Sequence, residues 1–314
     1  MVNKIISLAK LLRPRQWIKN LAVFAAITFA GELFDPLSFQ KVFLAFIAFC
    51  ALSSATYIIN DAFDIKKDRL HPFKRFRPLA SSAIPVSMAL VIAILLIASS
   101  MTIALFVNPG FLFLAIVYMT VQLLYSLFLK SIAIVDILAI ASGYILRVYG
   151  GEFAAGSHIS VWLLLTVICV SLFLAIGKRR SELTLLSSNK EVNIAAVRKT
   201  LSHYSERLLD VYASIFATST FISYSLFTFL ENPKGFKLGI SVLFPEYLPT
   251  FLERKWLMLT IAPVVYGLMR YLQDIYENKE GESPDRVLLS DKPLLITVIT
   301  WVLLVIGIIY FIGS

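Results

Sequence analysis

Three aspartates are regularly spaced in one short stretch of the 314-residue sequence, NDAFDIKKDR at positions 60–69. On a helix, Asp61, Asp64 and Asp68 fall within about 60° of one another and extend about 10 Å along the axis. Three carboxylates on one face repel one another unless cations bind them, and their hard oxygens suit Mg²⁺. The spacing therefore predicts a magnesium site. The alternative is a solvated helix end that neighbouring lysines and arginine neutralise.

The segment that follows, HPFKRFRP at 71–78, is strongly basic. Lys74, Arg75 and Arg77 lie between two prolines, which disfavour a regular helix and restrict the backbone. Such a rigid group of cations is an anion receptor beside the predicted metal. Metal and cations together favour a polyanionic substrate such as a diphosphate, whereas ordinary loop charge would explain only the sign.

The elements that must position these groups are membrane helices. The chain is 58% hydrophobic and 16% charged, with a mean hydropathy of +0.80, which excludes a water-soluble protein. Apolar stretches long enough to cross about 30 Å of hydrocarbon recur along it. We expect an all-α polytopic membrane protein, a single transmembrane domain over 1–314. The nine expected spans are at about 18–34, 42–59, 84–107, 111–128, 132–151, 159–176, 209–230, 256–272 and 293–312.

Positive charges are concentrated on one side of the predicted membrane. With the N-terminus in the cytoplasm, the external segments hold just Lys41, Lys234, Lys237, Arg254 and Lys255. This asymmetry predicts a cytoplasmic N-terminus and an external C-terminus in the cell membrane. Most carboxylates follow the cytoplasmic side, so we expect the polar site in cytoplasmic loops at about 60–83, 177–208 and 273–292. The net charge of +9 then indicates a basin for phosphates, and no nucleic-acid partner.

The motif Asn60-Asp61-x-x-Asp64-x-x-x-Asp68, at the end of the second of nine spans, resembles the UbiA superfamily of intramembrane prenyltransferases. With RPRQWIKN at 13–20 and GKRRSE at 177–182, the chain is similar to the decaprenyl-phosphate phosphoribosyltransferase branch. The resemblance implies a UbiA-like bundle with a cytoplasm-facing polar cavity. It also implies that the three aspartates hold Mg²⁺ and diphosphate, with Asn60 orienting that group or the sugar.

A further element, YSLFLK, runs from Tyr125 to Lys130 at the end of the fourth span, and Asp136 begins the fifth on the same side. It resembles a Tyr-Ser-x-x-x-Lys element of the superfamily, whose hydroxyl and ammonium are expected to touch a phosphate. An interfacial tyrosine and a snorkelling lysine are the structural alternative. The expected substrate-binding set includes these three residues, Lys74 and Arg77 for diphosphate, and Lys19 of the N-terminal motif.

The loop after the sixth span departs from relatives that use prenyl diphosphates, which carry a second aspartate-rich motif there. Here Lys178, Arg179 and Glu182 take its place, which favours one metal-diphosphate site plus a second, cation-lined phosphate site. Phosphoribosyl diphosphate has a separate 5-phosphate, and a polyprenyl phosphate acceptor brings another monophosphate. A plain ion pair between Lys178 and Glu182 is the alternative for this helical spacing.

The expected reaction is a Mg-dependent transfer of 5-phosphoribosyl from phosphoribosyl diphosphate to a polyprenyl phosphate of the decaprenyl type, with release of diphosphate. One alternative is UbiA-type prenyl transfer from a polyprenyl diphosphate to an aromatic or other acceptor. Another is an anion transporter, which would place charged or broken helices near the bilayer midplane. Arg147 lies within a span, and we interpret it as structural. The role of residues 281–293 stays open, and a homo-oligomer is compatible with the sequence.

Overall fold

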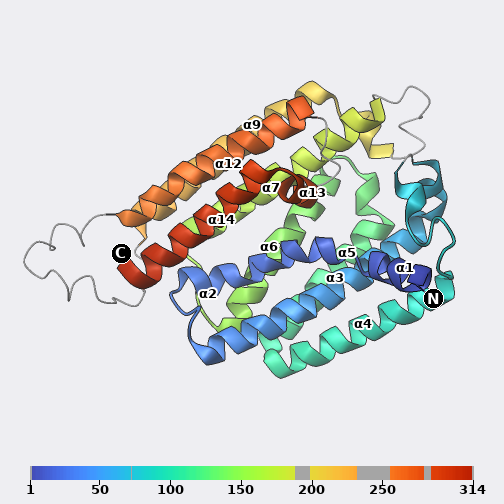
Figure 1. The fold of residues 1–314 in the computed structure, drawn as a ribbon, viewed down its shortest axis with the longest axis horizontal. Coiled ribbons are helices and arrows are strands. Elements are labelled where there is room, and N and C mark those ends of the chain that lie inside the picture. The colour runs from blue at the N-terminus through green and yellow to red at the C-terminus, as the bar shows by residue number, and fades with distance from the viewer. Residues whose placement is uncertain (1, 72, 188–198, 232–254, 279–283, 313–314) are drawn as a thin grey trace, which may run out of the picture.

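The computed structural model describes residues 2–71, 73–187, 199–231, 255–278 and 284–312, and these form helices with no strand among them (Figure 1). Short elements labelled η are single turns or short runs of 3-10 or π-helix. In chain order the elements are α1 Val2–Leu12, η1 Pro14–Phe24, α2 Ala25–Phe29, α3 Pro36–Leu70, η2 Lys74–Phe76, α4 Val86–Val107, α5 Pro109–Leu127, η3 Leu129–Ser131, α6 Val135–Ala155, α7 Val161–Ser187, η4 Lys199–His203, α9 Glu206–Leu230, η5 Trp256–Thr260, α12 Ile261–Gln273, η6 Asp274–Asn278, α13 Pro284–Ser290, α14 Lys292–Gly307 and η7 Ile308–Ile312.

Six described helices are long and apolar enough to cross a membrane: α3, α4, α5, α7, α9 and α14 with η7. The all-α, polytopic membrane architecture is therefore confirmed. The remaining predicted spans are helical but differ in build. Two of them divide into shorter pieces, η1 with α2 and η5 with α12, while α6 carries three charged side chains. The count of nine crossings stays a prediction.

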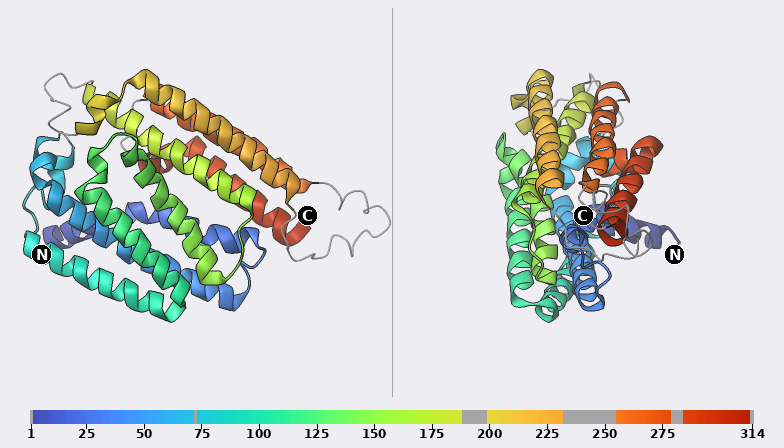
Figure 2. Two further views of the ribbon diagram at one scale, coloured as in Figure 1. Left: turned by 180° about the vertical axis from the view of Figure 1, so that it is seen from behind. Right: turned by 90° about the vertical axis from the view of Figure 1, so that its left-hand side faces the viewer.

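The long helices run side by side along the longest axis of the molecule (Figures 1 and 2). Helix α9 lies against α7 and α4 against α3, while α6 joins the two groups by contacting α3, α5 and α7. Figure 1 shows α1 and the last turn of α14 at opposite ends of the bundle. The polar groups described below lie at the end that carries α1.

Helix α3 carries the aspartate row. It begins where Asp35 accepts a hydrogen bond from the backbone N–H of Ser38 at 2.8 Å and Pro36 occupies the first turn. At 35 residues it is about 50 Å long, against about 30 Å of hydrocarbon. Its last turns therefore extend beyond the apolar layer, and they keep Asp61, Asp64 and Asp68 on one continuous helix.

Helix α7 continues to Ser187, which corrects the predicted loop at 177–208. Residues 178–187 contain neither glycine nor proline, so nothing in the local sequence ends the helix after the apolar run. Lys178, Arg179 and Glu182 consequently have fixed helical spacing. Part of the predicted loops, residues 188–198 and 279–283, lies outside the described residues.

Two features hold α6 in the centre of the bundle. A Cβ added at Gly151 would lie 1.8 Å from the carbonyl oxygen of Val23, so α6 can approach η1 this closely only with glycine there. Arg147 is buried and donates to Asn20 Oδ1 at 2.6 Å, to the Tyr118 hydroxyl at 2.7 Å and to the Gly143 carbonyl. These contacts support the structural interpretation of Arg147 and tie α6 to η1 and α5.

Candidate active site

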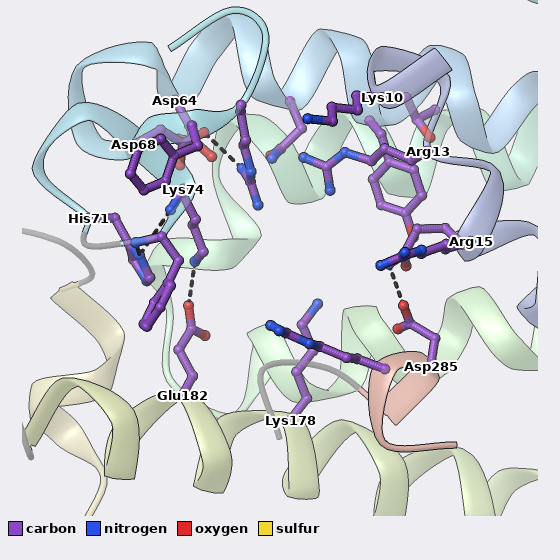
Figure 3. Close-up of a pocket in the computed structure, with 18 of the residues that line it drawn as sticks. Lys10, Arg13, Arg15, Asp64, Asp68, His71, Lys74, Lys178, Glu182 and Asp285 are labelled. Carbon is purple, nitrogen blue, oxygen red and sulfur yellow. Dashed lines mark hydrogen bonds and ion pairs between the residues drawn. The ribbon is translucent and has the colours of Figure 1, made fainter. Parts of the chain in front are cut away.

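A polar cavity of about 1020 Å³ lies at the α1 end of the bundle (Figure 3). Side chains of α1, η1, α3, η2, α5, η3, α7 and α13 line it, so segments from both ends of the sequence meet there. The predicted site residues in its lining are Lys19, Asn60, Asp64, Asp68, Lys74, Arg77, Tyr125, Lys130, Lys178 and Glu182. The structure brings these ten side chains together, whereas Asp61, Asp136 and Arg179 lie behind the lining.

Each aspartate of α3 faces a cation. Asp64 is held by Lys130 at 2.7 Å, and Asp68 by Arg77 at 2.7 Å. Asp61, whose side chain is 3% exposed, forms ion pairs with two arginines, Arg13 at 2.6 Å and Arg77 at 2.9 Å. The carboxylates therefore share one face, as the spacing predicts, but only Asp64 and Asp68 reach the cavity.

The donor chemistry at this end of the cavity fits a divalent cation. Asp64, Asp68 and the amide of Asn60 present hard oxygens, and Lys130 Nζ lies 3.2 Å from Asn60 Oδ1. Among the described residues, no three His, Cys, Asp or Glu side chains form a complete metal site. Of the common cations, Mg²⁺ is the one that takes one or two carboxylates and completes its shell with waters and phosphate oxygens.

The basic segment after α3 is ordered by His71, a residue that sequence patterns left without a role. Its Nδ1 accepts the backbone N–H groups of Phe73 at 3.2 Å and Lys74 at 3.3 Å. Burial and the neighbouring Lys74 lower the pKa of His71 to about 4, so the ring is neutral near pH 7 and Nδ1 is available as an acceptor. The imidazole thereby fixes the turn η2, which carries Lys74 and precedes Arg77.

A chain of ion pairs connects this basic segment to the interior. Lys74 Nζ lies 2.7 Å from Glu182, and Glu182 in turn accepts from Arg179 at 2.6 Å. The Arg179 guanidinium also pairs with Asp136 at 2.7 Å, and both of these side chains are 0% exposed. The Tyr125 hydroxyl accepts from Arg179 at 2.9 Å. Helices α5, α6 and α7 are joined to η2 in this way.

The burial of this pair corrects two sequence-based expectations. Arg179 and Asp136 were expected to touch substrate, but a fully buried guanidinium between two carboxylates cannot reach the cavity. Their position instead supports Glu182 and, through it, Lys74. The alternative interpretation, an ion pair between Lys178 and Glu182, is not found in the described residues, because Glu182 pairs with Lys74 and Arg179 while Lys178 lines the cavity.

The opposite wall is closed by a contact between η1 and α13. Asp285 pairs with Lys19 at 2.8 Å and accepts a hydrogen bond from Gln16. Burial alone would raise the pKa of the Asp285 carboxyl, but Lys19 outweighs it, so the pKa lies below the usual range. Asp285, Gln16 and Arg13 were missing from the predicted site. The string RPRQWIKN, which contains two of them, was the available signal.

Comparison with known proteins agrees with this architecture. The model of the UbiA prenyltransferase family matches residues 21–288. A decaprenyl-phosphate phosphoribosyltransferase of Corynebacterium glutamicum is 34% identical over 305 residues, which cover 96% of this chain and 86% of the relative. The protein of that name from Mycolicibacterium smegmatis is 35% identical over 313 residues, covering 98% of this chain and 94% of the relative.

Solved structures share the fold at low sequence identity. A UbiA homologue from Archaeoglobus fulgidus bound to GPP and Mg²⁺ superimposes with a TM-score of 0.69 at 19% identity, over 96% of this chain and 99% of that one. A digeranylgeranylglyceryl phosphate synthase gives a TM-score of 0.61 at 18% identity, with coverage of 96% and 99%. Sequence and fold therefore agree, and the chain belongs to the UbiA prenyltransferase family.

Proposed function

We propose that this protein transfers a 5-phosphoribosyl group from phosphoribosyl diphosphate to a polyprenyl phosphate and releases diphosphate. The observation that supports the proposal is a single cavity lined by carboxylates and by a larger number of cations. The carboxylates would bind a metal-diphosphate complex, and the additional cations would bind the other phosphates. The relatives named decaprenyl-phosphate phosphoribosyltransferase support it, because they align over nearly the whole chain.

Mg²⁺ would be held by Asp64 and Asp68, with Asn60 as a neutral oxygen donor beside them. When bound, the ion would neutralise charge on the diphosphate and make it a better leaving group. The Mg²⁺-bound UbiA homologue of known structure supports this choice of metal for the fold. Asp61 would act from behind the cavity by holding Arg13 and Arg77 in place.

The remaining polar groups would position the substrates and stabilise the leaving diphosphate. Lys74, Arg77 and Lys130 border the aspartates and would bind the diphosphate as charge develops on it. The phosphate oxygen of the acceptor is already an anion, so the reaction needs no strong general base. Catalysis would then come mainly from alignment of the anomeric carbon with that oxygen and from stabilisation of the leaving group.

The cavity would face the cytoplasm, where a water-soluble sugar diphosphate is available. The excess of lysine and arginine at the α1 end supports this orientation by the positive-inside rule. The polyprenyl tail would remain in the bilayer beside the helices, while its phosphate enters the cavity. The protein is then an integral membrane transferase whose two substrates arrive from different phases.

Transfer of ribose-labelled phosphoribosyl diphosphate to decaprenyl phosphate tests the proposal directly. Purified protein should form labelled lipid and free diphosphate only with Mg²⁺, and Asp64→Asn should lower the rate by about 100-fold or more. Asp210→Asn is the matched control, because Asp210 pairs with Arg180 outside the cavity. Diphosphate release from a polyprenyl diphosphate with an aromatic acceptor, and none from phosphoribosyl diphosphate, would refute the proposal.

A further inference from the structure

Most cations that line the cavity already have a carboxylate partner. Lys74 pairs with Glu182, Lys130 with Asp64, and Lys19 with Asp285. Arg13 and Arg77 likewise pair with the aspartates of α3. These pairs leave little net positive charge at the aspartate end of the cavity.

Three lining cations differ: Lys10, Arg15 and Lys178. Within the part of the chain that the structure describes, none of them has an ion-pairing carboxylate. Lys10 lies in the last turn of α1, Arg15 lies at the start of η1, and Lys178 projects from α7 (Figure 3). Three unpaired cations around one cavity repel one another unless an anion lies among them.

Of the three, Arg15 lies farthest from the aspartates in Figure 3. Figure 3 shows Arg15 across the cavity from Asp68 and Lys74, with Lys178 entering between the two sides. Arg13 has φ 53° and ψ 55°, a left-handed conformation that turns the chain sharply between α1 and η1. This turn brings Lys10 and Arg15 to the same cavity from two helices.

Helix α1, which carries Lys10, has an apolar face and an exposed basic side chain. Helix α1 packs Leu11, with partly buried Leu8 and Leu12, against the apolar cluster of α3 and α4, while Lys10 is exposed at the cavity. An apolar face beside exposed basic residues is typical of a helix lying at a membrane interface. Lipid phosphates lie at that level of the bilayer, so the phosphate of a lipid acceptor would enter the cavity beside Lys10 and Arg15.

We propose that Lys10, Arg15 and Lys178 form a separate phosphate-monoester subsite that binds the phosphate of the lipid acceptor. The inference rests on the proposed function and adds the location of the acceptor headgroup. A monoester carries a charge of about −1.5 to −2 near pH 7, which three cations match. Arg15 can bind it through two N–H groups, and the lysines act as point charges. Arg179, which the sequence predicts to bind phosphate together with Lys178, has a buried guanidinium and is not part of the subsite.

Separate Michaelis constants for the two substrates test the subsite. Arg15→Gln and Lys178→Met should each raise KM for decaprenyl phosphate by about 10-fold or more, because each change removes one charge-assisted hydrogen bond to the phosphate. KM for phosphoribosyl diphosphate should change less than about threefold, because its diphosphate binds at the other end. Lys178→Arg should recover most of the affinity, and Lys67→Gln is the control, an exposed lysine of α3 outside the cavity.

Two kinetic outcomes would overturn the subsite. A selective rise in KM for phosphoribosyl diphosphate would assign these cations to its 5-phosphate instead. If the KM values of the subsite variants equal those of Lys67→Gln for both substrates, no phosphate binds at the subsite. Melting temperatures of the variants separate both outcomes from misfolding.

A binding measurement keeps the subsite independent of the proposed reaction. Calorimetry with geranyl phosphate, a short polyprenyl monophosphate, should show at least about tenfold weaker binding to Arg15→Gln than to wild type. Wild type that binds geranyl phosphate through these residues but fails to transfer phosphoribose would refute the reaction and retain the subsite. Equal binding to wild type and Arg15→Gln would refute the subsite even if transfer occurs.

Discussion

Replacement of Asp136 by asparagine would break the most deeply buried ion pair of the described chain. Asp136 lies 2.7 Å from Arg179 and accepts from the Tyr204 hydroxyl at 2.7 Å, and the Asp136 and Arg179 side chains are 0% exposed. The asparagine amide keeps the shape but removes the charge. Arg179 is then left buried with Glu182 as its one remaining carboxylate partner in the described residues.

The size of the effect follows from this burial. Breaking a buried pair by removing one partner costs about 3–5 kcal/mol, because the remaining charge is poorly compensated. At about 2 °C per kcal/mol for a chain of this size, Asp136→Asn should lower Tm by at least about 6 °C. Arg179 should also draw Glu182 away from Lys74, so KM for phosphoribosyl diphosphate should rise.

Thermal unfolding of the purified protein in detergent measures this loss. The control is Asp210→Asn, which removes a carboxylate that is 34% exposed and leaves Arg180 paired with Glu206, so it should cost less than about 1 kcal/mol. Adding Arg179→Met to Asp136→Asn should cost at least about 1 kcal/mol less than the sum of the single changes. If Asp136→Asn melts within about 1 °C of the control, the buried-pair argument is wrong.

Three further changes probe other contacts. Gly151→Ala should abolish folded protein on size-exclusion chromatography, because its methyl group would overlap a carbonyl of η1, whereas Gly307→Ala has open space and should leave the elution profile unchanged. Asp285→Asn should lower Tm at pH 7. The difference in Tm between wild type and Asp285→Asn should vanish in acid. The folded-state pKa of Asp285 lies below the ordinary value of about 3.9, so the ionised carboxylate stabilises the fold above about pH 3.9, and this stabilisation is lost as the pH falls through the folded-state pKa. His71→Ala should raise KM for phosphoribosyl diphosphate by about fivefold or more through loss of two hydrogen bonds, with partial recovery in His71→Asn, and steady-state kinetics would contradict this if both variants match wild type.

The membrane fold and the aspartate row were predictable because both depend on local spacing. Apolar length sets which helices can cross the bilayer, and the positions of Asp61, Asp64 and Asp68 on one helix set their common face. The basic segment beside them was predictable for the same reason. The end of α7 was not, since a polar continuation of an apolar helix reads as a loop when only hydropathy is considered.

The sequence by itself determined which faces are apolar, which carry charge and which motifs lie near the membrane surface. Only the tertiary structure decided which charges meet. Lys74 and Glu182 are 108 positions apart and Gln16 and Asp285 are 269 apart, so their contacts depend on how distant helices pack. Helix packing also determines burial: Arg179 is buried in the interior, whereas Lys178 lines the cavity. Neighbouring residues of the same charge thus have different surroundings, because the helix periodicity points one inward and the other toward the cavity.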